Sequence, residues 1–110
     1  MPVPTQETLV LEAPARLTIG RGDAELRATI RSALDQGYRS IVLDMENVRR
    51  LDSSGVGEII AAHVLVRDLG GRLVLGRLST RAGGVLAATR LTGVLEIHDS
   101  LEGALLGAAA

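Results

Sequence analysis

The sequence predicts one domain of the α/β class, with a mostly parallel central sheet, about four helices and an N-terminal β-hairpin. Short aliphatic runs alternate with segments whose apolar residues recur at helical spacing, which indicates alternating strands and helices. Strands joined by helical crossovers of one hand lie parallel in a sheet. A chain of 110 residues is long enough for one hydrophobic core and is the usual size of one domain.

The N-terminal part of the chain carries two short strand signals. Residues 1–7, which include two of the three prolines, are expected to form an extended lead-in, and the domain is expected to span residues 8–107. Thr8–Leu11 and Arg16–Ile19 are rich in β-branched and aliphatic residues. Because Ala13-Pro14 between them is typical of a turn, the two strands are predicted to pair as a hairpin.

The first predicted helix follows a glycine-rich break, Gly20-Arg21-Gly22-Asp23, and ends at Gly37. Its apolar residues return every three or four positions, which is the period of a helix packed on one side. Asp23 stands at the start, where a carboxylate can accept the free amides of the first turn, and it is a candidate cap.

The rest of the chain alternates strictly between strands and helices. Ser40–Leu43 is a short apolar run typical of a strand covered on both faces. The next helix ends at Gly70-Gly71, and its apolar face is predicted to contain Val56, Ile59, Ile60, His63 and Val64. The remaining elements are expected in the order strand Arg72–Leu75, helix Thr80–Thr89, strand Leu95–Ile97 and helix Leu101–Leu106.

Composition excludes several classes of function. The net charge is −1 and all 12 basic residues are arginine, so the basic excess of a nucleic-acid-binding protein is missing. Without cysteine there is no disulfide, thiolate metal site or thiol nucleophile. No apolar stretch approaches the roughly 20 residues of a membrane span. The start lacks a signal-peptide pattern, so cytoplasmic residence is expected.

The segment most suggestive of chemistry is Leu51-Asp52-Ser53-Ser54-Gly55-Val56-Gly57, which connects the Ser40–Leu43 region to the second helix. If Asp52 is the N-cap, Leu51 and Val56 stand at the positions of a hydrophobic staple, and both serines fall in the first turn. Whichever residue caps, free backbone amides and the positive end of the helix dipole tolerate added negative charge here.

Catalytic and cofactor interpretations of this segment are weaker. A hydrolase serine needs a base and a Gly-x-Ser-x-Gly elbow, but the elbow is missing and His63 and His98 are the only histidines. Gly55-Val56-Gly57 lacks the third glycine of a dinucleotide fingerprint. Asp44 as the phosphoacceptor of a receiver domain would need a lysine that the chain lacks. No enzyme activity, cofactor or metal site is expected.

The stretch SIVLDMENVRRLDSSGVGEIIAAHVLVRDLGGRLVL, together with LAATRLTGVLEIHDSLEGAL, resembles the STAS-domain family, and specifically the bacterial anti-sigma factor antagonists. The resemblance runs from about Gly37 to Leu105. It implies that Ser53, directly after the aspartate of the Asp-Ser-Ser-Gly motif, is a phosphorylation site. It also implies a partner-binding loop that contains Asp23, Asp52, Ser53, Ser54, Gly55, Gly57 and Glu58.

The resemblance implies partner switching. The unphosphorylated protein would bind an anti-sigma factor that is also a serine kinase and release a sigma factor, and a PP2C-type phosphatase would reset the switch. Two features depart from the family pattern: Gly20–Asp23 lacks a leucine before the aspartate, and Glu58 stands where a smaller or apolar residue is common. The alternative is a constitutive STAS scaffold or accessory subunit of an ABC transporter or a stressosome-like assembly.

Overall fold

The computed structural model describes residues 7–89 and 93–109, so residues 1–6 of the expected lead-in lie outside the described part. Parallel pairing joins all four strands of the central sheet, in the order β1-β3-β5-β6, and also joins β2 to β4. The elements are β1 (Thr8–Glu12), β2 (Arg16–Leu17), α1 (Asp23–Asp35), β3 (Ser40–Asp44), β4 (Arg50–Leu51), α2 (Ser53–Asp68), β5 (Arg72–Gly76), α3 (Thr80–Thr89), β6 (Glu96–His98) and α4 (Leu101–Ala109).

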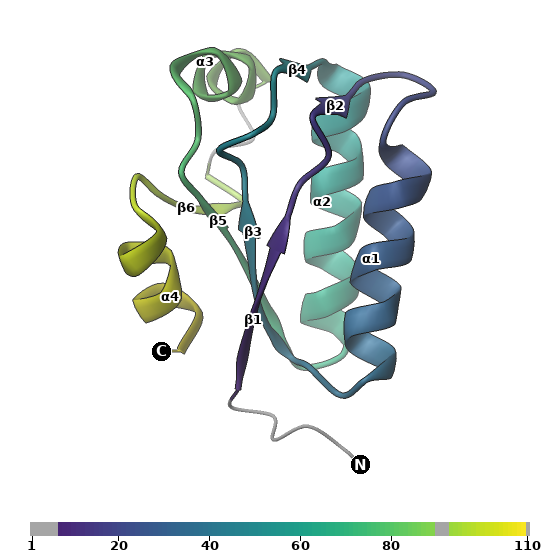
Figure 1. The fold of residues 1–110 in the computed structure, drawn as a ribbon, viewed down its shortest axis with the longest axis vertical. Helices are drawn as coiled ribbons and strands as arrows, with labels where there is room; N and C mark the ends of the chain where they lie inside the picture. Colours follow the sequence, from purple (N-terminus) through teal and green to yellow (C-terminus); the bar gives the residue numbers. More distant parts are fainter. Residues whose placement is uncertain (1–6, 90–92, 110) are drawn as a thin grey trace.

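The helices cover the sheet unequally. Figure 1 shows α1 and α2 side by side on one face and the short α4 on the other, while α3 lies beyond the carboxyl ends of the strands. The larger core cluster includes the inward side chains of α1, α2, β3 and β5, whereas the cluster under α4 centres on Val42, Val74, Ala104 and Ala108. Burial of all five β3 residues identifies it as the central strand.

The predicted N-terminal hairpin is wrong. β1 pairs with β3 and β2 pairs with β4, both in parallel and in two different sheets, so β1 and β2 do not pair with each other. The segment with Pro14 does not reverse the chain, since Ala13 is buried and its amide donates to the Asp44 carbonyl. Proline fixes one backbone angle at a value that extended chains also adopt, so it continues the strand direction here.

The other predicted elements are present, with shifted ends. β6 begins one residue later than predicted, and α4 continues to Ala109. On α2, Val56 and Ile59 of the predicted apolar face are fully buried, whereas Ile60 and Val64 are half-buried, and His63 is half-buried as expected. Ala62 and Val66 complete the buried face because α2 packs against α1 as well as the sheet. None of the described helices is long and apolar enough to cross a membrane.

The short β2–β4 pair, which was not predicted, fixes where α2 begins. Leu17 pairs with Leu51, and the Asp52 amide donates to the Leu17 carbonyl at 3.2 Å. The first turn of α2 therefore sits beside the loop between β2 and α1, at the carboxyl edge of the central sheet (Figure 1).

Candidate functional site

Asp52 is the N-cap of α2 and also holds the neighbouring loop. Its Oδ1 accepts the Gly55 amide at 2.9 Å, and its Oδ2 accepts the Ile19 amide at 3.0 Å. These hydrogen bonds, the one from Gly55 first, favour the ionised form and hold the pKa of Asp52 below its usual value. One carboxylate thus joins the start of α2 to the β2–α1 loop.

Ser53 and Ser54 are the first two residues of α2, and both are exposed. No hydrogen bond joins either side chain to a histidine among residues 7–89 and 93–109; His98 contacts Glu96 at 2.7 Å instead. The geometry of a serine nucleophile with an imidazole base is therefore not assembled here. What the arrangement does offer is two hydroxyls at the positive end of a 16-residue helix.

The two serines lie on different sides of the helix. Successive helical residues are rotated by about 100°. Ser54 therefore shares its side with Glu58 and Ala61, which face α1. Ser53 shares its side with Ile60, away from α1. Figure 1 shows α1 and α3 on opposite sides of this end of α2.

Gly55 is required by the packing of α2 on β2. A Cβ at this position would run into the Leu17 carbonyl oxygen, whereas a Cβ at Gly57 would meet nothing within 4 Å. The glycine of the Asp-Ser-Ser-Gly motif is therefore explained by close approach of two backbones. Gly57 is exposed and leaves the surface beside the serines flat.

Asp23 does not cap α1, contrary to the sequence-based interpretation. The N-cap is Gly22, at φ 80°, with no side-chain cap. A side chain at Gly22 would collide with the Arg16 carbonyl as well as strain the backbone, so the chain uses glycine here. Asp23 is instead the first residue of the helix, where its negative charge interacts favourably with the positive end of the helix dipole.

Arg27 brings Asp23 and Glu58 together. Its guanidinium lies 3.5 Å from the Asp23 carboxylate and 3.9 Å from that of Glu58, which links α1 to α2. We call Asp23, Arg27, Ser54 and Glu58 the α1 flank of the site. Sequence reasoning missed Arg27, although its position four residues after Asp23 on a helix was a usable signal.

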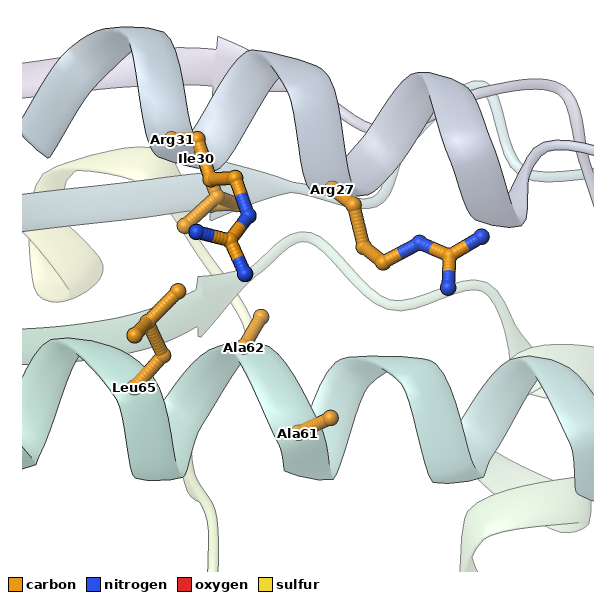
Figure 2. A pocket seen from close by; sticks show the side chains of 6 residues that line it. All are labelled: Arg27, Ile30, Arg31, Ala61, Ala62 and Leu65. Atoms are coloured by element: carbon orange, nitrogen blue, oxygen red, sulfur yellow. The ribbon is translucent and has the colours of Figure 1, made fainter.

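A hollow of about 150 Å³ continues the α1 flank along the two helices. Figure 2 shows the small side chains of Ala61 and Ala62 on α2 opposite Arg27 and Arg31 on α1. The Arg31 guanidinium extends toward α2, whereas that of Arg27 points along the helices, away from Arg31. The serines do not line this hollow.

Ile19 is an exposed apolar residue beside the serine loop. It lies in a tight turn closed by two backbone hydrogen bonds between Thr18 and Arg21, at 3.0 and 3.1 Å. Its side chain is 78% exposed, although its amide is held by Asp52. An aliphatic residue displayed on an ordered turn suits a protein contact, and it was predicted as part of a strand.

Arginines gather on the other side of the α2 start. A groove of about 300 Å³ is lined by Thr18, Arg49, Arg50, Leu51, Asp52, Arg81 and Val85. We call this set the α3 flank, because Arg81 and Val85 belong to α3. Within the described residues no ion pair or hydrogen bond is formed by the side chains of Arg49, Arg50 or Arg81. The adjacent Arg49-Arg50 was a signal that sequence reasoning left unused.

Asp44 has a structural role. Its Oδ1 accepts the Glu46 amide at 3.1 Å, and Arg77 donates to both carboxylate oxygens, at 3.1 and 2.5 Å. Arg77 chiefly, and the Glu46 amide, hold the pKa of this buried carboxyl below its usual value despite burial. Asp44 thus starts the turn after β3, as the sequence suggested, and ties it to β5.

Comparison with known proteins identifies the family. Residues 3–104 match the family model of the STAS domain. A Thermotoga neapolitana protein named as a homologue of the anti-sigma factor antagonist TM1081 is 32% identical over 72 residues, which are 66% of this chain and 64% of that protein. The chain therefore spans slightly less than two thirds of the length of that relative.

Solved structures share the fold. The anti-sigma factor antagonist SpoIIAA in its unphosphorylated form superposes with a TM-score of 0.72 at 27% identity, covering 94% of this chain and 89% of that one. Its phosphorylated form, from Bacillus, gives 0.66 at 25%, covering 96% and 94%. A sulfate transporter family protein from Wolinella succinogenes gives 0.78 at 20%, covering 96% and 87%. On the family match and this architecture, the chain belongs to the STAS-domain family and has the fold of its anti-sigma factor antagonists.

Proposed function

We propose that the protein is an anti-sigma factor antagonist that works by partner switching at Ser53. In its unmodified form it binds an anti-sigma factor that is also a serine kinase, and the sigma factor is released. Phosphorylation of Ser53 ends this binding, and a PP2C-type phosphatase restores it. The observation that carries the proposal is an exposed serine at the first position of α2, directly after an N-cap aspartate.

The chemistry of the switch is transfer of the γ-phosphoryl group of ATP. A bond forms between the Ser53 Oγ and the phosphorus, the bond from that phosphorus to the ADP oxygen breaks, and the hydroxyl proton passes to a base of the kinase or to water. The product carries about −1.5 to −2 charges at pH 7. Because that charge falls at the amino end of a helix, it is compatible with the folded state.

The binding surface would include both exposed apolar and charged groups around Ser53. Ile19 offers an apolar contact, Gly57 allows close approach, and Asp23 and Glu58 offer carboxylates. A phosphoryl group on Ser53 would have to be desolvated at this surface beside Asp52, which has the same sign of charge. A shift from 99% bound to 99% free requires about a 10⁴-fold difference in affinity.

Incubation with the cognate kinase and ATP tests the proposal. Mass spectrometry is expected to find the phosphate on Ser53 and not on Ser54. Ser53→Ala should stay folded and bind the kinase whether or not ATP is present. Ser53→Asp should bind more weakly than the unmodified protein, but less so than the phosphorylated form, because it adds only about one charge.

Two results would redirect the proposal. Phosphate on Ser54 would keep the mechanism and move its site. Equal affinity of phosphorylated and unmodified protein for the kinase would rule out switching and favour a constitutive STAS scaffold or accessory subunit in a transporter or stressosome-like assembly.

A further inference from the structure

We propose that the arginine groove of the α3 flank binds the phosphoryl group of Ser53 once it is attached. The inference rests on the proposed phosphorylation of Ser53 and adds a receptor for the phosphate within the same chain. The groove is lined by Arg49, Arg50 and Arg81 and also by Asp52, the residue before Ser53, although the unmodified Ser53 side chain does not itself line it.

The position of Ser53 on α2 directs its modification toward this groove. Ser53 lies about 140° around the helix from Glu58, whose carboxylate faces α1 and Arg27. It therefore occupies the side of α2 that is turned away from α1, where β4 and α3 approach the helix (Figure 1). Ser54, one residue later, faces the α1 flank instead.

The groove carries a positive charge that the described fold does not neutralise. Arg49, Arg50 and Arg81 are exposed and have no acidic partner in the part of the chain that the structure describes. Arg50 also lies opposite Arg16 in the parallel β2–β4 register, so two like charges stand on neighbouring strands and repel each other. A dianion placed among these side chains would relieve that repulsion.

The single carboxylate in the groove, that of Asp52, offsets only one of the three positive charges. Both oxygens of Asp52 already accept backbone amides, from Gly55 and Ile19. Guanidinium groups bind phosphate through paired, charge-assisted hydrogen bonds, and arginine is the side chain best suited to this geometry. Bound there, the phosphoryl group would turn a positive surface beside Ser53 into a nearly neutral one, which changes the electrostatic surface presented to a partner.

The test uses the whole chain with phosphoserine incorporated during translation at position 53, so no kinase is needed. Phosphorus NMR follows the second ionisation of the phosphate, whose pKa is about 6 in a free phosphoserine. Nearby guanidinium groups are expected to lower this pKa by about one unit. Arg50→Gln and Arg81→Gln should each raise it, and the double variant should raise it most.

Phosphoserine at position 54 is the matched control, because it experiences the same helix dipole on a different side of α2. Its pKa is expected to respond little to Arg50→Gln and Arg81→Gln. Arg31→Gln, an exposed arginine of the α1–α2 hollow, should change neither pKa. Thermal unfolding of each variant checks that the fold is retained.

The proposal fails if the pKa at position 53 is unchanged by the double variant, or if position 54 responds to it equally. That failure would leave partner switching intact, because switching requires only the added charge. Conversely, a kinase that never modifies Ser53 would refute the proposed function while leaving the NMR result unchanged.

Discussion

The two flanks of the α2 N-terminus differ in how their charges are balanced. On the α1 flank, Arg27 is shared between Asp23 and Glu58, so each charge has an opposite neighbour. On the α3 flank, three arginines line a groove whose one carboxylate, that of Asp52, is occupied by backbone amides. The same helix end thus separates a surface with more carboxylates than arginines from one with more arginines than carboxylates.

This difference gives the adjacent serines different surroundings. Both gain the same stabilisation of negative charge from the helix dipole. The side of Ser53 is bordered by three arginines that line one groove, whereas Ser54 faces the carboxylate of Glu58 on the α1 flank. If the proposed groove binds phosphate, a phosphoryl group on Ser53 should be stabilised more than one on Ser54.

The largest effect is expected from Ile59→Ala, which removes support from both flanks. Ile59 is fully buried beneath the first turns of α2, and its truncation should reduce the free energy of unfolding by about 2 to 5 kcal/mol. Ile60→Ala is the control, because Ile60 is only half-buried and its truncation should reduce the free energy of unfolding by less. Equal losses in denaturant titrations of the two variants would contradict this packing.

Gly55→Ala should separate α2 from β2 and so disturb both flanks at once. Its new methyl group would meet the Leu17 carbonyl, and overpacking of this kind costs about 1 to 3 kcal/mol. Gly57→Ala has open space and should stabilise the helix by up to about 1 kcal/mol. The melting temperatures of the two variants should therefore shift in opposite directions. Two shifts of the same sign would contradict the close approach of α2 to β2 at Gly55.

Asp52→Asn removes the charge of the residue that joins the two flanks. Its effect on stability should depend on pH. The folded-state pKa of Asp52 is lowered, so its charge contributes stability above the unfolded-state pKa of about 4, and that contribution is lost as pH falls through the folded-state value. The variant should be less stable than the parent at pH 7 and should lose less on acidification. Parallel melting-temperature curves from pH 7 to pH 2 would contradict this role.

The smallest effect is expected on the α1 flank alone. Arg27→Gln removes contacts to two partly exposed carboxylates, so the free energy of unfolding should change by less than about 1 kcal/mol. Arg27→Gln should leave the pKa of the phosphate on phosphoserine 53 nearly unchanged if the charges of the two flanks do not interact. A pKa change there as large as that from Arg81→Gln would remove the distinction between the flanks.

Local signals in the sequence predicted most helices and strands but not the difference in charge between the two flanks. The apolar run at β3 and the Asp-Ser-Ser-Gly start of α2 are contiguous, so their structure could be inferred from spacing. The α3 flank joins Arg50 to Arg81, which are brought together only by the packing of α3 near β4. The hairpin prediction failed because Pro14 fits an extended segment as well as a turn, and only pairing with β3 and β4 decides between them.

The most direct test of the central claim is the affinity for the anti-sigma kinase of three forms of the protein: unmodified, phosphorylated at Ser53 and phosphorylated at Ser54. Calorimetry would give the three dissociation constants. The unmodified form is expected to bind tightly, and phosphorylation of Ser53 should weaken binding by about 10⁴-fold if the switch is nearly complete. A dissociation constant unchanged by phosphate on Ser53 would contradict it.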